Sequence, residues 1–239
     1  MPLIAAYHRP DTIDEALSLL DNSARIPLAG GTIINADREP SDLEVVDLQG
    51  LELDAIEPVG DRLRIGATAT LAAVTDSEHV PDTLRDLARR DQPASIRSLG
   101  TVGGTIASAD PDSTFVAALL VHDAQVELAG SDDTSLAALL DSGIPAGSII
   151  TAVLIDPSGV TASMATGRTP ADTPIVSAVA RTVGATATLA LTGVATTAVI
   201  VAPEDPTDGL NPPGDFRGSS AYRLHLASIL SARALEAVR

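Results

Sequence analysis

The order of apolar and polar residues divides the chain into short helices and strands. Apolar residues recur at helical spacing over residues 12–20 and 219–238, which predicts an amphipathic helix near each end. Short apolar runs bounded by Gly, Pro or Asp predict strands. The predicted strands are 45–48, 62–67, 125–128 and 149–155, and the other predicted helices begin at residue 71 or lie within 83–90, 114–122, 132–141 and 173–181.

One charge-free stretch, residues 183–203, has the length of a membrane span without its composition. Ala, Thr and Gly are frequent in it, and residues 185–191 alternate with a period of two. Thr192-Gly193 interrupts this alternation, and residues 198–201 can return as a second strand. We therefore predict a β-hairpin. A long loop rich in Pro, Gly and Asp, residues 203–218, separates it from the last helix.

Two segments carry paired glycines flanked by threonine: residues 29–32 (Ala-Gly-Gly-Thr) and residues 101–105 (Thr-Val-Gly-Gly-Thr). Because glycine has no Cβ, a loop of this kind can bring several backbone N–H groups to one anion. Two such loops could hold two ends of a large anionic ligand, such as the diphosphate of a dinucleotide. The alternative is that both are ordinary tight turns, where glycine pairs are also common.

Composition and charge narrow the possible functions. The 239 residues are 45% hydrophobic but include only two Phe, two Tyr and no Trp, so Ala, Val, Leu and Ile must build the core. Such a core suits a mixed α/β protein. The net charge of −17 disfavours nucleic acids and anionic membranes as partners. Backbone amides, more than a basic patch, would have to hold an anionic ligand against this field.

The sequence also bears on redox chemistry, metals and location. The chain contains no Cys, which excludes disulfides, thiolate catalysis and cysteine-ligated iron–sulfur clusters on this chain. The four His residues lack the spacing of metal ligands, so we predict no metal site. The start of the chain does not show the basic and apolar segments of a signal peptide, and we expect a cytoplasmic protein.

A change in the pattern of residues near position 145 predicts a domain boundary. The break at residues 143–147, rich in Gly and Pro, separates the two parts. We expect a first domain over residues 1–145, with a small N-terminal lobe over about residues 1–55. The second domain is expected over residues 146–239.

Six segments, in order, carry a resemblance to a known family. They are residues 7–10 with 14–16, 27–32, 46–48, 63–68, 96–105 and 215–226. In these segments the chain resembles the FAD-binding (medium) subunit of the molybdenum hydroxylase family. That family includes the medium subunit of carbon monoxide dehydrogenase and the FAD domain of xanthine dehydrogenase. The resemblance extends over nearly the whole chain and is more specific than either glycine pair alone.

The resemblance implies an α+β fold: a PCMH-type FAD-binding domain of two α/β lobes, followed by a small α+β C-terminal domain with an antiparallel sheet. It implies non-covalent FAD, with both glycine segments donating backbone N–H groups to the diphosphate. The implied cofactor contacts are Leu28, Ala29, Gly30, Gly31, Thr32, Ile33, Arg97, Thr101, Val102, Gly103, Gly104, Thr105 and Thr114. For Arg97, contact with the flavin phosphates and pairing with a surface acid are both open interpretations.

The function implied by the resemblance is that of an oxidoreductase subunit. It would be an electron-transfer flavoprotein within a molybdopterin-dependent dehydrogenase or hydroxylase complex. Its implied partners are a large molybdopterin-binding subunit and a small 2Fe-2S subunit. Electrons would pass from the iron–sulfur clusters to FAD and then to NAD, oxygen or a quinone. No acid–base residue of this chain is assigned a catalytic role.

Departures from the family pattern motivate a second hypothesis, and a third stays open beside it. The family usually has Asn at the positions of Ser98 and Thr105 and Asp at that of Thr114, and an aromatic residue and a lysine in the segment around Ala165. The second hypothesis is therefore a scaffold or interaction subunit that keeps the fold without flavin. The third is a stand-alone enzyme that binds another nucleotide through the same loops.

Overall fold

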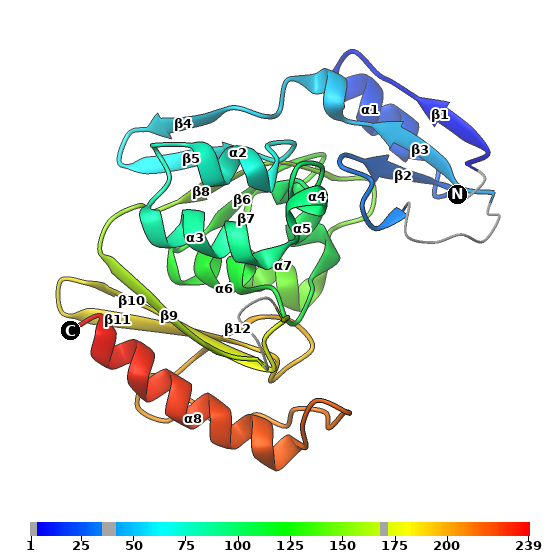
Figure 1. Ribbon diagram of the computed structural model, residues 1–239. Helices are drawn as coiled ribbons and strands as arrows, with labels where there is room; N and C mark the ends of the chain where they lie inside the picture. The colour runs from blue at the N-terminus through cyan, green and yellow to red at the C-terminus, as the bar shows by residue number, and fades with distance from the viewer. Residues whose placement is uncertain (1–3, 35–41, 168–171) are drawn as a thin grey trace.

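The computed structural model describes residues 4–34, 42–167 and 172–239, which form three β-sheets with helices packed around them (Figure 1). A three-stranded sheet belongs to the N-terminal lobe, a five-stranded sheet to the centre, and a four-stranded sheet to the C-terminal part. The predicted α+β class, with an antiparallel C-terminal sheet, is confirmed. None of the helices in these described ranges is long and apolar enough to cross a bilayer.

The N-terminal lobe is a parallel sheet packed against one helix. Its elements are β1 (Ala6–His8), α1 (Ile13–Leu20), β2 (Arg25–Leu28), β3 (Glu44–Asp47) and the 3-10 turn η2 (Gln49–Leu51), with strand order β1-β3-β2. Helix α1 begins where predicted because the Thr12 hydroxyl accepts a hydrogen bond of 3.2 Å from the Glu15 N–H. Ala16 and Leu20 are buried on its inner face.

The central sheet is antiparallel and has the strand order β4-β5-β8-β6-β7. Its strands are β4 (Ile56–Val59), β5 (Arg62–Gly66), β6 (Gln125–Ala129), β7 (Thr134–Ser135) and β8 (Ile149–Ile155). The helices are α2 (Leu71–Asp76), α3 (Asp82–Asp91), α4 (Ala94–Arg97), α5 (Val102–Ser108), α6 (Thr114–Val121) and α7 (Leu136–Ser142). Helix α6 carries no charged residue and is buried along its whole length, so it forms part of the main core.

Strand β8 bears on the expected domain boundary. It lies between β5 and β6, with Leu63 paired to Ile155 and Val126 paired to Val153. A boundary near residue 145 would remove this central strand from its own sheet. We therefore propose a boundary after Ile155 in place of the break at residues 143–147.

The C-terminal part is an antiparallel sheet covered by the last helix, which lies along it in Figure 1. Its elements are β9 (Val160–Thr166), β10 (Val176–Val183), β11 (Thr186–Thr192), β12 (Val199–Val201) and α8 (Ser220–Ala237). Strand β11 pairs with β12, with Leu189 opposite Val201, as the predicted return of the chain required.

The predicted helix over residues 173–181 is wrong, because residues 176–183 form strand β10. This strand is hydrogen-bonded to β9 on one side and to β11 on the other. Ala178 and Ala180 face the cluster beneath α8, while Val179 belongs to the main core. A strand buried on both faces carries apolar residues on both, so it loses the alternation that marks a half-exposed strand.

A buried polar cluster joins the central and C-terminal sheets. The His122 ring, 1% exposed, hydrogen-bonds the Asp156 carbonyl through Nδ1 (2.7 Å) and Thr161 Oγ1 through Nε2 (2.9 Å). Arg181 donates to the Val121 carbonyl at 3.0 Å and pairs with the Asp156 carboxylate at 2.5 Å. Burial lowers the pKa of His122 to about 4, and the nearby charge of Arg181 acts in the same direction.

This cluster predicts an acid-sensitive contribution to stability. Unfolded His122 titrates near pH 6.5 but folded His122 only near pH 4, so the folded state is disfavoured as pH falls through that window. From pH 7 to pH 4 we expect a loss of about 2–3 kcal/mol of unfolding free energy from this group. Urea titrations of a His122→Asn variant should lack that part of the pH dependence, whereas exposed His79→Asn should retain it. Equal pH slopes in the two variants would contradict the assignment.

Candidate functional site

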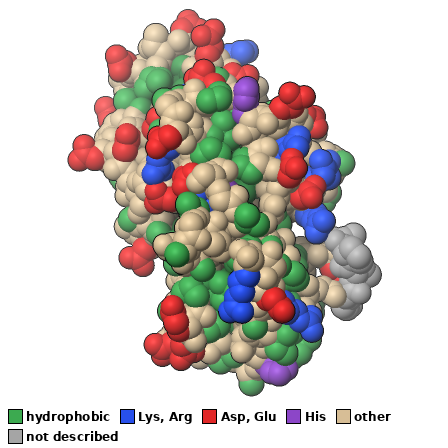
Figure 2. All heavy atoms as spheres, turned by 90° about the vertical axis from the view of Figure 1, so that its left-hand side faces the viewer, with side chains coloured by type: hydrophobic (Ala, Val, Ile, Leu, Met, Phe, Trp, Pro, Cys, Tyr) green, Lys and Arg blue, Asp and Glu red, His purple; other side chains and the backbone are tan. Residues whose placement is uncertain are grey.

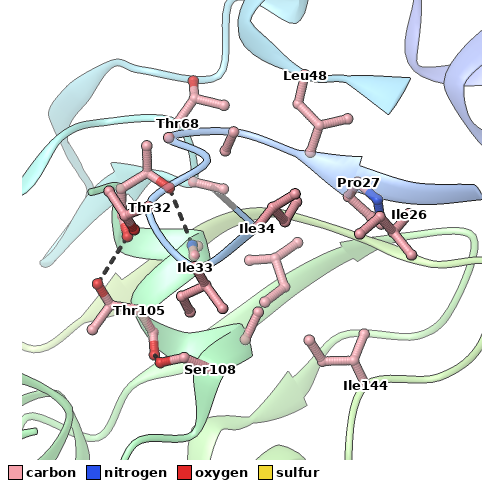
Figure 3. A pocket seen from close by; sticks show the side chains of 18 of the residues that line it. Ile26, Pro27, Thr32, Ile33, Ile34, Leu48, Thr68, Thr105, Ser108 and Ile144 are labelled. Carbon is pink, nitrogen blue, oxygen red and sulfur yellow. Dashed lines mark hydrogen bonds between the residues drawn. The ribbon is translucent and has the colours of Figure 1, made fainter. Parts of the chain in front are cut away.

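A cavity of about 770 Å³ lies between the N-terminal lobe and the central sheet. Its size falls within the range of about 300–1,000 Å³ that is typical of ligand sites. Four segments that are distant in sequence form most of its walls: residues 26–34, residues 67–68 after β5, residues 100–110 around α5, and residues 144–150, which lead into β8. In Figure 3, Pro27 and Leu48 lie on the upper side, and Thr105, Ser108 and Ile144 on the lower side.

The first glycine segment follows directly from β2 and has a conformation that requires glycine. Gly31 has a φ of +67°, in the left-handed region. A Cβ on Gly30 would lie 1.9 Å from the carbonyl oxygen of Leu99, so only a residue without a side chain fits there. The loop therefore packs, backbone to backbone, against the residues that precede the second glycine segment.

The second glycine segment is the first turn of α5 rather than a loop. Thr101 caps this helix, its Oγ1 accepting from the Gly104 N–H at 3.1 Å. The N–H groups of Val102 and Gly103 donate to the carbonyls of Ala69 and Ala67, at 2.9 and 2.8 Å.

These bonds change what the second segment can offer an anion. The Thr105 N–H and hydroxyl both donate to the Thr101 carbonyl, each at 2.9 Å. Counting these with the previous bonds, the N–H groups of residues 102–105 are all occupied within the protein. The expectation that this segment donates them to a diphosphate is therefore not supported.

The first segment differs in this respect. Within the described part of the chain, no acceptor is paired with the N–H groups of Gly30, Gly31 or Thr32. All three residues line the cavity. Consecutive unoccupied amides on a glycine loop can bind the oxygen atoms of an anion. The first loop is thus where the described residues offer backbone donors to an anionic ligand.

The cavity carries almost no charge. Asp110 is the only ionisable residue among the described residues that line it, and no Lys, Arg or His is among them. Elsewhere the surface is acidic, and Figure 2 shows Asp and Glu side chains spread over the visible face. Apolar side chains, including Ile26, Ile34 and Ile144, form much of the wall. Such a site suits a ligand with a flat apolar part and an anionic part held by amides.

Comparison with known proteins identifies the family of this chain. A profile of the FAD-binding domain in molybdopterin dehydrogenases matches residues 3–155. The chain belongs to this family. The resemblance to the FAD-binding subunit of molybdenum hydroxylases is thereby confirmed, and FAD is the cofactor of the family.

Individual relatives agree with this assignment. The chain is 28% identical over 247 residues to the uncharacterized protein YgfM of Escherichia coli K12, covering 96% of this chain and 95% of that protein. It is 31% identical over 166 residues to the carbon monoxide dehydrogenase medium chain of Afipia carboxidovorans, covering 62% and 57%. Its fold matches a chain of the reconstituted CO dehydrogenase from Oligotropha carboxidovorans with a TM-score of 0.88 and 25% identity, covering 100% and 98%.

Most of the residues expected to contact the cofactor do line the cavity of this FAD-binding domain. They are Ala29, Gly30, Gly31, Thr32, Ile33, Thr101, Gly103, Gly104 and Thr105. Leu28 and Val102 adjoin them without lining the cavity, as the last residue of β2 and the buried first residue of α5.

Arg97 and Thr114 lie outside the cavity wall. The Arg97 guanidinium donates to the main-chain carbonyls of Arg89 (2.6 Å) and Gln92 (3.3 Å), so in the structure it serves neither interpretation offered above. Thr114 is buried in the first turn of α6, where its hydroxyl lies 3.4 Å from the Asp91 carboxylate. Burial raises the pKa of this Asp91 carboxyl group.

The sequence did not reveal the wall formed by residues 144–150. The Gly- and Pro-containing break at residues 143–147 predicts a domain boundary and gives no sign of a ligand site. In the structure this segment faces the first glycine loop across the cavity, and the Ser148 hydroxyl donates to the Pro145 carbonyl at 2.6 Å. No local pattern distinguishes a break that lines a cavity from one that separates domains.

The close approach at Gly30 gives a direct test of this geometry. Gly30→Ala is expected to lower the free energy of unfolding by about 1–3 kcal/mol, because its Cβ would overlap the Leu99 backbone. Gly50→Ala is the control: the nearest atom to its Cβ would be 3.5 Å away, and a change within about 0.5 kcal/mol is expected. Urea unfolding measures both. Equal stability of the two variants would argue against the loop contact.

Proposed function

We propose that this chain is the FAD-carrying, electron-transfer subunit of a molybdopterin-dependent dehydrogenase complex. The observation that carries the proposal is the cavity of about 770 Å³ beside a glycine loop with unoccupied amides. Membership of the family of FAD-binding domains in molybdopterin dehydrogenases supports it.

The residues present fit FAD in both size and chemistry. The amides of Gly30, Gly31 and Thr32 would hold the diphosphate, since no cationic side chain is among the described lining residues. Isoleucine side chains and Pro27 offer apolar surface to the rings. When bound, FAD supplies the redox chemistry, while the protein binds, orients and shields it. No side chain of this chain is assigned a proton transfer.

The absence of Cys bears on which partner subunits the chain needs. Without Cys it offers no thiolate for an iron–sulfur cluster, so such clusters would lie on another chain. We propose a small 2Fe-2S subunit and a large molybdopterin-binding subunit as partners, in the cytoplasm. The name of one relative, a medium chain, is consistent with a multi-subunit enzyme. The electron acceptor is proposed to be NAD, oxygen or a quinone.

The scaffold hypothesis is less well supported. The departures at Thr105, Thr114 and Ala165 motivate it, yet Thr114 does not line the cavity, and the Thr105 hydroxyl donates to the Thr101 carbonyl within α5. Neither change fills the space next to the first glycine loop.

The proposal predicts that the isolated chain binds FAD through the first loop. Thr32→Asp is expected to weaken FAD binding by at least about tenfold, because it adds a negative charge beside the amides. Thr186→Asp, the same change at an exposed position on β11, is expected to leave affinity unchanged. Quenching of flavin fluorescence gives the dissociation constants. A wild-type chain that fails to bind FAD at micromolar concentration, or that binds only NAD or ATP, would refute the proposal.

The charge distribution predicts an unusual salt dependence. The protein carries a net charge of −17, and no cationic residue is among the described lining residues, so long-range repulsion opposes an anionic ligand. Raising NaCl from 0.01 to 0.15 M shortens the screening length from about 30 to about 8 Å and is expected to tighten FAD binding about two- to fivefold. Riboflavin, which lacks the phosphates, is the control ligand. Marked weakening with salt would instead indicate a cationic contact.

A further inference from the structure

We propose that Gln49 is a positioning residue that orients the first glycine loop toward the anionic part of the cofactor, an inference that rests on the proposed function. The Gln49 side chain is exposed, yet its Nε2 donates to the Ala29 carbonyl at 3.0 Å, across 20 residues of sequence. Ala29 is the first residue of the glycine loop and lines the cavity. Gln49 is not among the described lining residues.

The geometry of the peptide group explains how a contact behind the loop acts in front of it. In a trans peptide the C=O and N–H bonds point in opposite directions from one rigid plane. The Ala29 carbonyl and the Gly30 N–H belong to the same peptide, so holding the carbonyl toward Gln49 turns the N–H away from it. The same bond keeps a carbonyl oxygen, which would repel phosphate, turned toward Gln49.

Gln49 is itself held in place from the core of the lobe. Its backbone N–H donates to Asp47 Oδ1 at 2.9 Å, and Asp47 is only 5% exposed. The Tyr7 hydroxyl donates to the other oxygen of the same carboxylate. A continuous series of hydrogen bonds therefore runs from β1 through the end of β3 to the glycine loop.

The loop is consequently fixed from two sides. On one side Gly30 packs against the backbone of Leu99, which leaves no room for a side chain. On the other side the Gln49 amide holds the Ala29 carbonyl. Gly31 follows these contacts in the chain, lines the cavity and has a left-handed backbone that glycine adopts without strain. Preorganised donors bind an anion without a further ordering cost, which gives Gln49 an effect on affinity beyond its effect on stability.

The test uses Gln49→Met, which keeps the length of the side chain and removes the donor. The matched control is Gln125→Met on β6, because the Gln125 amide also donates, to Asp123 at 3.4 Å, and lies away from the cavity. Three quantities are measured on the full chain: the dissociation constant for FAD, the free energy of unfolding without ligand, and the ¹⁵N order parameter of the Gly30 amide without ligand.

For Gln49→Met we expect FAD binding to weaken about five- to tenfold, with the unfolding free energy unchanged within error. The Gly30 order parameter should fall from a rigid value of about 0.85 toward about 0.6. Gln125→Met should change neither affinity nor Gly30 order. Unchanged FAD affinity in Gln49→Met would overturn the inference, as would a loss of affinity matched by an equal loss of stability. If the wild-type chain binds no FAD, the proposed function fails, and the Gly30 order parameter alone then supports or overturns the role of Gln49.

Discussion

The backbone contact between Gly30 and Leu99 sets the relation between the two lobes that form the cavity. At 1.9 Å from a would-be Cβ, the Leu99 oxygen admits only glycine at position 30. A second close approach lies where the chain passes from the N-terminal lobe to the central sheet, because a Cβ on Gly66 would lie 2.2 Å from the Leu53 carbonyl oxygen. At both places main chain meets main chain, so these two contacts depend on backbone positions and not on side-chain rotamers.

The site pairs an acidic protein with an uncharged cavity, and this decides how an anion can be held. With a net charge of −17 and no Lys, Arg or His among the described lining residues, long-range attraction is not available. The backbone N–H dipoles of the glycine loop remain, and they attract an anion effectively only when they point toward the same place. The network from Tyr7 through Asp47 and Gln49 to the Ala29 carbonyl gives the loop that orientation. Residues outside the cavity lining thus contribute to its chemistry.

The C-terminal sheet has its own core cluster beneath α8 and also contributes residues to the main core. Strand β10 places Val179 in the main core and Ala178 and Ala180 beneath α8. Buried polar groups reinforce this junction: Arg181 reaches the carbonyl that ends α6, and His122 reaches residues on both sides of the turn between β8 and β9. Disturbing the junction is therefore expected to reach α6, whose N-terminal end lies close to the segment that lines the cavity.

Features that depend on neighbouring residues in the chain can be predicted from the sequence. The start of α1, the hairpin pairing of β11 with β12 and the two glycine segments follow from local patterns, and the family resemblance rests on six ordered segments. Only the tertiary structure decided that residues 176–183 form a strand, since burial on both faces removes the alternation that marks one. It also decided that residues 102–105 use their amides internally, that Arg97 turns away from the cavity, and that residues 144–150 complete the wall. These outcomes depend on which carbonyls and side chains meet across the fold, and that information is spread over the whole chain.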